Sequence, residues 1–493
     1  MKSKQFFKNA LRYLIKKNEM EKNSIVPRGI LLPFILLTSL FFAWALPNNL
    51  TDTMLAAFKR IMSLTDTKTA WIQVSCYLLG YGCFAIPGAL FIKKYTYKAG
   101  VIFGLGLYAS GAFLFYPAML LSSANINISF LMFLFAIVIL FAGLSILETS
   151  TNSYVYASGP EQTATQRLNF AQSFNPFGAI AGVIISQVFI LSKLSTLGPE
   201  QRSMLRPDEL TRIQGVELNA VTMTYVAVGL VMVILLLLIW ATKMPNLKED
   251  DNQLDLMGTF RRLRKNRNYV WGVTTQFFYV GAQIAVWSFT IRYVMQQLDL
   301  DAVVAGLGNK ATTTDIMQKL RNVEPLAAGF YNLLEAIGLS QLLPKTAEQA
   351  GATYYILSLV LFVIARFICT ALMKFIKPRL LLASLALLAF VFCFITIYSD
   401  GFAGIYALVG ISGCMSLMFP TIYGMGITGL KGDTKIGGSG MVMAIAGAAV
   451  LTQIQGIVSD QSGSIKFAYW VPAFAFLLIA YYSLVVCRKL KIS

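Results

Sequence analysis

Residues 44–52 read Trp44-Ala45-Leu46-Pro47-Asn48-Asn49-Leu50-Thr51-Asp52. They belong to an apolar run, residues 29–58, in which Asp52 carries the single charge. A run of this length predicts a membrane-spanning helix. An ionised side chain inside such a helix costs about 2.5 kcal/mol or more unless it faces water or a polar cavity. We therefore expect Asp52 either to face a polar cavity or to lie near enough to the outer membrane surface to be hydrated.

Helical spacing gathers other polar side chains around Asp52. Trp44, Asn48 and Asp52 follow one another at intervals of one helical turn, and Asn49 comes three residues before Asp52. Pro47 removes a backbone donor beside them, which predicts a kink and a freed carbonyl group. The first span therefore carries an aromatic ring, amides and a carboxylate on one face, which indicates a binding site.

The composition excludes a soluble globular protein and a disordered chain, because 56% of the 493 residues are hydrophobic and only 13% are charged. A net charge of +18 would suggest nucleic acid in a soluble protein. Here the basic residues stand at the ends of apolar runs, where they orient the spans and contact lipid headgroups. The sequence has no histidine, and its six cysteines show no paired spacing, so we expect no metal, no cofactor and no disulfide. Proton chemistry must then use carboxylates.

Twelve apolar runs are long enough for membrane-spanning helices. They are residues 29–58, 69–92, 99–121, 128–156, 168–192, 218–242, 268–291, 352–374, 380–399, 402–430, 436–459 and 467–487. Successive spans cross the membrane in alternate directions, so every second connecting segment lies on the same side. Lys and Arg gather in the segments of one side, namely residues 1–28, 93–98, 243–267, 374–379, 431–435 and 488–493. Because positive loops stay inside, both termini are predicted to be cytoplasmic.

The charged segment 243–267 divides the chain into two halves of six spans. Each half has a basic turn after its second span, which makes the halves weak parallel repeats. We predict an all-α integral membrane protein in which twelve transmembrane helices form two six-helix bundles, residues 29–242 and 268–487. A basic cytoplasmic segment, residues 1–28, precedes them and a cytoplasmic tail, residues 488–493, follows. Residues 298–351 form an external insertion that is a lid, a partner surface or decoration.

A second polar group lies in the fourth and fifth runs. Glu148 is well inside the fourth run, with Asn152 one turn later, and a lone carboxylate in a span is a functional-site candidate. Asn169, Gln172 and Asn175 recur at every third residue of the fifth run. Amides both donate and accept hydrogen bonds, which suits sugar hydroxyls. The alternative is that they join helices by hydrogen bonds.

Motifs along nearly the whole chain carry a specific resemblance. They are Leu40-Phe41-Phe42-Ala43-Trp44 with Asn48-Asn49-Leu50-Thr51-Asp52, Pro87-Gly88-Ala89-Leu90-Phe91-Ile92-Lys93-Lys94, Tyr97-Lys98-Ala99-Gly100, Leu147-Glu148-Thr149 with Asn152, Arg167-Leu168-Asn169-Phe170-Ala171-Gln172-Ser173-Phe174-Asn175, Tyr279-Val280-Gly281-Ala282-Gln283 with Trp287-Ser288, Phe419-Pro420-Thr421-Ile422-Tyr423, and Gly432-Asp433-Thr434-Lys435. Through them the chain resembles the L-fucose–proton symporter family of the major facilitator superfamily.

The resemblance implies a monomeric twelve-helix fold, alternating access and import of a monosaccharide together with protons. The sugar would be L-fucose or a related hexose such as galactose or glucose. Asp52 matches the family's protonation switch and Glu148 its substrate-linked carboxylate. Ser153 and Phe419 depart from the family, which tends to have Pro and Tyr there, and we expect both changes to alter the cavity lining.

The residues suggest how such a protein works. A proton from outside would neutralise Asp52, because burial disfavours the charged form of a carboxylate, and Glu148 would share the proton coupling. The expected substrate contacts are Asn48, Asn49, Glu148, Asn152, Gln172, Asn175 and Gln283, with Trp44 or Trp287 stacking on the sugar ring. The partners would be the sugar, protons and the lipid of the inner cell membrane. The sequence shows neither a metal-binding cluster nor an activated nucleophile, so we do not expect an enzyme. A sodium-coupled sugar transporter, a drug or metabolite antiporter and a non-transporting sugar sensor stay open as alternatives.

Overall fold

The computed structural model describes residues 30–64, 66–190, 204–245, 256–298, 325–336 and 347–489, together with a few single residues between these ranges. Nearly all of the expected basic segment 1–28, much of the linker 243–267, most of the insertion 298–351 and most of the tail 488–493 lie outside the described part. The side chain of Asp52 also lies outside it, although its backbone belongs to a helix.

The described residues form helices and no strands. In the first half these are α2 (Leu31–Ile61), α3 (Asp66–Gln73), η2 (Val74–Gly82), α4 (Cys83–Lys94), α5 (Tyr97–Leu120), α6 (Ile126–Ala157), α7 (Ala164–Gln172), α8 (Asn175–Ile185), η5 (Ser186–Ile190) and α10 (Pro207–Ala241). In the second half they are α11 (Leu256–Lys265), α12 (Arg267–Leu298), α15 (Pro325–Ala336), α16 (Ala347–Leu372), α17 (Pro378–Tyr398), α18 (Phe402–Met415), α19 (Met418–Ile427), α20 (Thr434–Met443), η9 (Ala444–Ala446), α21 (Gly447–Ser462), α22 (Trp470–Tyr481), η11 (Tyr482–Val486) and α23 (Cys487–Lys489).

Local sequence sets several helix ends. The Thr96 hydroxyl accepts a hydrogen bond from the Ala99 amide at 3.0 Å and so caps α5. Asn125 caps α6 in the same way, and α10 and α17 each begin at a proline, whose missing N–H costs nothing in the first turn. The chain therefore turns at short polar segments between long apolar helices.

Eleven helical segments of the described chain are long and apolar enough to cross a membrane, and they correspond to eleven of the expected runs. The remaining run, residues 268–291, lies in α12, an unbroken helix of 32 residues. Its polar side chains, among them Gln276 and Gln283, lower its mean hydropathy. A helix with such a composition is expected to line the protein interior rather than face lipid.

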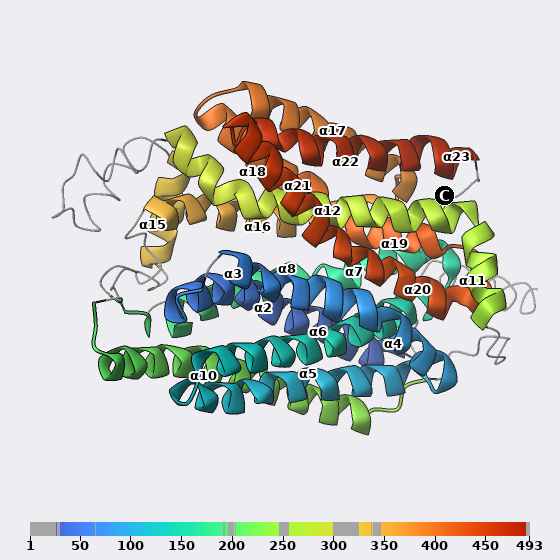
Figure 1. Cartoon of the computed structure of the whole chain (residues 1–493). Coiled ribbons are helices and arrows are strands. Elements are labelled where there is room, and N and C mark those ends of the chain that lie inside the picture. The colour runs from blue at the N-terminus through green and yellow to red at the C-terminus, as the bar shows by residue number, and fades with distance from the viewer. Residues whose placement is uncertain are drawn as a thin grey trace, which may run out of the picture.

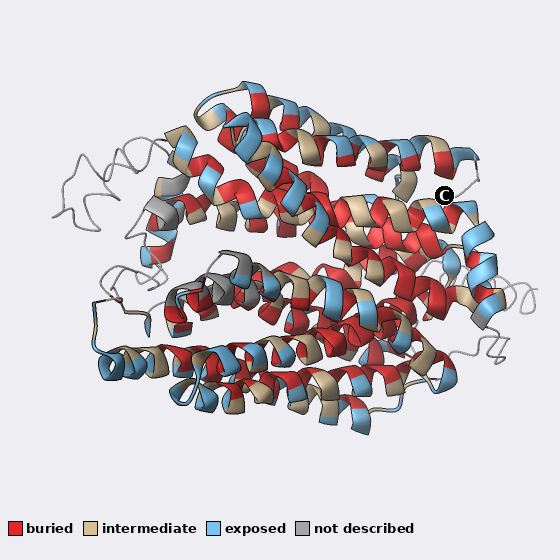
Figure 2. Cartoon of the chain, viewed as in Figure 1, coloured by how far each residue is buried: buried red, intermediate tan, exposed pale blue. Residues whose placement is uncertain are grey.

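The helices from α2 to α10 lie together, and those from α12 to α23 lie together above them in Figure 1. Large apolar side chains such as Trp240 of α10 and Phe474 of α22 are about two-thirds exposed. Figure 2 shows buried residues between the helices and exposed ones along the outer flanks of both groups. An apolar exterior of this kind matches a protein whose solvent is lipid.

The two bundles meet at the end of the molecule where α11 and α23 lie, which we call the α11 end (Figure 1). Among the described residues, hydrogen bonds between the bundles here join Ser153 to Tyr423 at 3.1 Å, Tyr156 to Thr428 at 3.1 Å, Asn169 to Thr421 at 3.1 Å and Gln166 to the Thr370 carbonyl at 3.0 Å. The opposite end carries α15, which packs on α16 through a 2.9 Å hydrogen bond between Tyr331 and Thr353.

Candidate functional site

A cavity of about 140 Å³ lies between the two bundles. Side chains from α2, η2, α6, α7 and α8 line it on one side, and side chains from α12, α16, α19 and η9 line it on the other. Because each bundle supplies one wall, a molecule in this cavity contacts both bundles at once.

Most of the predicted site residues line this cavity. They are Trp44, Asn48, Asn49, Glu148, Gln172, Asn175, Gln283 and Trp287. Asn152 stands directly behind the wall, where its side-chain oxygen accepts a hydrogen bond from Gln172 Nε2 at 2.9 Å. Asp52 follows Asn48 by one turn of α2, with its side chain outside the described part.

Three helices break where they reach the cavity. The fifth span is interrupted between α7, which ends at Gln172, and α8, which begins at Asn175. The tenth span is interrupted between α18 and α19, just before Phe419, and η9 interrupts the eleventh at Ile445. Broken helices leave backbone carbonyls without helical partners, and membrane proteins accept such backbone where it lines a cavity.

Arg366 of α16 donates hydrogen bonds to carbonyl groups at two of these breaks. Arg366 is 3% exposed, and its guanidinium donates to the Ser416 carbonyl after α18 and, at 3.0 Å, to the Gln172 carbonyl at the end of α7. The same guanidinium lies over the Phe362 ring, 4.7 Å from its centroid. A cation at two helix C-termini is favourable because the exposed carbonyls carry partial negative charge. Arg366 thus joins the two bundles at the cavity wall.

The sequence prediction missed Arg366. Apart from Lys374 at the very end, it is the one charge in the apolar run 352–374, which is the same signal that drew attention to Asp52 and Glu148. A lone cation in a span is as costly as a lone carboxylate and therefore equally informative.

Glu148 of α6 is buried and lines the cavity together with Tyr81. Tyr81 belongs to η2, a π-helical stretch of nine residues in the second span. Such stretches occur mostly at functional sites, because their wider turn changes which residues face inward. The sequence analysis did not single out Tyr81 or its neighbour Tyr77, which also lines the cavity.

The cavity amides are partly bonded within the protein. Asn175 Nδ2 donates to the Phe41 carbonyl at 3.2 Å, and Asn49 Nδ2 donates to the Ala45 carbonyl at 2.9 Å. In the described part of the chain, Asn48 Oδ1 is buried without a hydrogen-bond partner. Asn169 takes the alternative role expected for these amides, since its Nδ2 binds Thr421 across the bundles. The amides of Asn48, Asn49 and Asn175 line the cavity instead.

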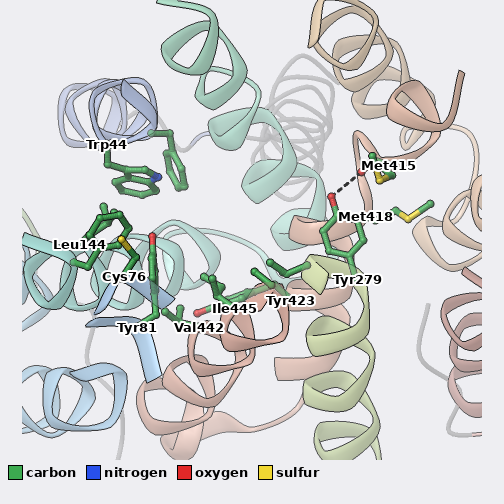
Figure 3. Packing of buried hydrophobic residues seen from close by; sticks show 14 of the residues in the cluster. Trp44, Cys76, Tyr81, Leu144, Tyr279, Met415, Met418, Tyr423, Val442 and Ile445 are labelled. Carbon is green, nitrogen blue, oxygen red and sulfur yellow. Dashed lines mark hydrogen bonds between the residues drawn. The ribbon is translucent and has the colours of Figure 1, made fainter. Parts of the chain in front are cut away.

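Two tryptophans supply apolar surface from opposite sides. Trp44 of α2 packs against Phe41 with ring centroids 4.4 Å apart, and Trp287 of α12 packs edge-on against Phe362 at 5.3 Å. Trp287 Nε1 also donates to Ser412 Oγ at 3.1 Å, which fixes the orientation of the ring. Figure 3 shows Trp44 facing the space above Tyr81. An apolar face with polar groups around it suits the ring of a sugar.

We predicted that Ser153 and Phe419 both alter the cavity lining, and for one of them the prediction is wrong. Phe419 does line the cavity, as expected. Ser153 does not, because it is completely buried between the bundles, where it bonds to Tyr423. Its helix, α6, passes from the cavity at Glu148 to the α11 end within two turns, so Ser153 meets the facing bundle instead of the cavity.

A family model described as Major Facilitator Superfamily matches residues 33–431. The chain belongs to the major facilitator superfamily. It is 35% identical to the L-fucose-proton symporter of Haemophilus influenzae over 486 residues, which is 95% of this chain and 99% of the relative. It is 28% identical to a glucose/galactose transporter of Brucella abortus over 91% of this chain and 92% of that protein.

Solved structures agree with this assignment. The chain superposes with a TM-score of 0.75 and 34% identity on a major facilitator superfamily transporter crystallised in the outward conformation, covering 92% of this chain and 98% or more of that one. The predicted all-α facilitator fold and the family are therefore confirmed, and the curated relatives are transporters rather than enzymes. The cytoplasmic position of the termini, the exact domain boundaries and the roles of single site residues stay predictions.

Proposed function

We propose that this protein is a proton-coupled symporter that imports a monosaccharide by alternating access. The observation that carries the proposal is a cavity that both bundles line, with a buried carboxylate, several amides and two tryptophans. The names of the relatives, which are L-fucose-proton symporters and glucose/galactose transporters, support the same substrate class.

Sugar recognition divides between polar and apolar groups. The hydroxyls of the sugar bond to Glu148, Gln172 and Asn175 on one wall and to Gln283 on the other, since carboxylate and amide groups together offer both donors and acceptors. Trp44 or Trp287 covers the apolar face of the ring. L-Fucose, or a related hexose such as galactose or glucose, is the proposed substrate, and Phe419 helps to select among them.

Proton coupling rests on Asp52 and Glu148. A proton that neutralises Asp52 removes the cost of holding a charge inside the protein, and the bundles then rock around the occupied cavity. The basic loops assign the α11 end to the cytoplasm, so the bundles are joined on the inner side and the sugar enters from the α15 end. The protein works as a monomer in the inner membrane, and α15, a described helix of the external insertion 298–351, lies at the end where the sugar enters.

Uptake into proteoliposomes tests the proposal. Radiolabelled L-fucose, D-galactose and D-glucose are offered with an inward proton gradient, with an inward sodium gradient, and with neither. We expect uphill accumulation of at least one sugar with the proton gradient alone, and its collapse when a protonophore is added. Accumulation driven by sodium, or binding without any accumulation, would contradict the proposal and favour a sodium-coupled transporter or a sensor.

A further inference from the structure

A second hollow lies in the first bundle, between α10 and the pair formed by α2 and α8. Its volume is about 630 Å³, and we call it the α10 groove. Leu46 of α2, Ile185 of α8 and Phe189 of η5 form one wall. The other wall is one face of α10 from Val216 to Val231, whose lining residues recur at the helical spacing i, i+3, i+4 and i+7. Ligand pockets typically have about 300–1,000 Å³, so the groove is large enough to hold a molecule.

Contacts on other sides of α10 keep the groove open. Away from the groove, Tyr225 of α10 stacks on Phe115 of α5 with ring centroids 4.2 Å apart. At the α15 end, Gln214 Nε2 of α10 donates to the Ile61 carbonyl at the C-terminus of α2, at 2.8 Å. Because α10 is held by α5 along its length and by the end of α2, it does not need a ligand to stay apart from α8.

The polar residues of the groove lie at the level expected for lipid headgroups. Lys193 directly follows the fifth apolar run, and Asn219 is the second residue of the sixth. Deeper in the groove, the Thr224 hydroxyl is bonded to the Ala220 carbonyl at 2.8 Å. From Asn219 to Val231 the wall extends about 18 Å, at about 1.5 Å per residue. One leaflet is about 15 Å deep, which is half of a hydrocarbon core of about 30 Å. The groove therefore has polar groups at the membrane surface and an apolar wall about as long as one leaflet.

The charge at the mouth of the groove is positive. Lys193 and Asn219 are exposed, and in the described part of the chain neither side chain has a hydrogen bond or an ion pair. The acidic residue nearest to them along α10, Glu217, is buried and bound to Arg202, whose guanidinium donates to its two carboxylate oxygens at 2.9 Å and 2.5 Å. The other acidic residues of α10 are in its first turn, ten or more residues before Asn219. The ammonium group of Lys193 thus has no local counter-ion along α10.

We propose that the α10 groove binds an anionic phospholipid of the outer leaflet, with an acyl chain along α10 and the phosphate at Lys193 and Asn219. The ammonium attracts a negatively charged headgroup, and the amide donates to phosphate or ester oxygens. The lipid also contacts α2 and α8, whose other faces line the sugar cavity at Asn49 and Ala179. It therefore supports a wall of that cavity from behind without entering it.

Native mass spectrometry of the purified, delipidated protein tests this site. Dioleoylphosphatidylglycerol and dioleoylphosphatidylethanolamine, which share their acyl chains and differ in net charge, are titrated separately. Lys193→Gln removes the charge at the groove, and its control, Arg212→Gln, removes an exposed charge of α10 that does not line the groove. Ala227→Trp fills the groove from its exposed wall, and its control, Leu237→Trp, adds the same ring at an exposed position of α10 elsewhere.

We expect the wild type to bind one phosphatidylglycerol about fivefold more tightly than phosphatidylethanolamine, which is the effect of one basic residue near an anionic lipid surface. Lys193→Gln should remove this preference and still bind both lipids through the apolar wall. Ala227→Trp should lose the specific binding of both lipids. Arg212→Gln and Leu237→Trp should behave as the wild type.

Two results would overturn the inference. Equal effects of Lys193→Gln and Arg212→Gln would mean that phosphatidylglycerol responds only to the general charge of this surface. Unchanged lipid binding by Ala227→Trp, or an equal loss in Leu237→Trp, would mean that the lipid does not occupy the groove. Lys193 is exposed, so its variant decides the question of charge even if a tryptophan variant fails to fold. None of these measurements involves transport, so a failure here leaves the proposed function untouched.

Discussion

Gly438 offers a direct way to weaken the closure at the α11 end. It lies on α20, against the hydrogen bond that joins Ser153 of one bundle to Tyr423 of the other. A Cβ at this position would stand 2.5 Å from Ser153 Oγ and 2.5 Å from Tyr423 Oη. Both hydroxyls belong to side chains without exposed surface, so Gly438→Ala must separate them or push α20 away.

The size of the effect follows from that one contact. A hydrogen bond contributes about 0.5–1.5 kcal/mol net, and leaving a buried polar group unpaired costs about 1–3 kcal/mol. A destabilisation of about 1–3 kcal/mol changes a conformational equilibrium by about fivefold to 150-fold. Gly438→Ala should therefore shift the population from the state closed at the α11 end toward the state open there.

Distances between spin labels at residues 95 and 375 would measure this shift. Tyr95 and Phe375 are exposed, belong to different bundles and lie within the basic segments 93–98 and 374–379. The labels require a background without the exposed Cys83. The matched control is Gly456→Ala on α21, where an added Cβ meets no atom within 4 Å. If Gly438→Ala and Gly456→Ala give the same distance distribution as the parent, the Ser153–Tyr423 contact does not hold this end closed.

Three further substitutions test the cavity. Asp52→Asn should abolish proton-driven accumulation but retain sugar counterflow, because the amide imitates a protonated acid; undiminished accumulation would exclude Asp52 as the coupling group. Glu148→Gln should weaken sugar binding about tenfold or more through loss of a charge-assisted hydrogen bond, measured by calorimetry, and normal affinity would contradict that role. Arg366→Lys should lower thermal stability and transport together, since a lysine cannot donate to the Ser416 and Gln172 carbonyls in the planar geometry of arginine; unchanged melting in detergent would show that other groups satisfy those carbonyls.

Much of the fold follows from the sequence because lipid imposes a simple rule. Each span must satisfy its own backbone hydrogen bonds, so an apolar run of sufficient length is a helix regardless of its neighbours. A second rule, that a lone charge inside an apolar span marks a functional site, also predicts part of the cavity. Glu148 is such a charge, and it does line the site. Applied to cations as well, it would have found Arg366.

Other parts of the site depend on tertiary structure and have no local signal. Tyr81 lines the cavity from η2, which is π-helical, and a shift of one residue in the helical register is not visible in an apolar sequence rich in aromatic residues. The departure of Ser153 from the family pattern predicts a change in the cavity lining, but the facing bundle covers this residue. Which residues lie between the two bundles depends on where the bundles touch. No repeating pattern in a single sequence shows where that contact lies.

Gln172 brings the cavity and the closure of the bundles together in one residue. Its side chain lines the cavity and donates to Asn152, while its carbonyl, freed by the break between α7 and α8, accepts from Arg366 of the other bundle. A sugar that forms a hydrogen bond with the Gln172 side-chain amide therefore pulls on the end of α7. The bundles are also joined on this helix, through Asn169 and Thr421. Because one short helix carries all of these contacts, a displacement of α7 on binding reaches the Arg366 link and the α11 end together. Coupling between sugar occupancy and rocking of the bundles then needs no separate signal through the protein, since the same backbone forms the binding wall and the joint.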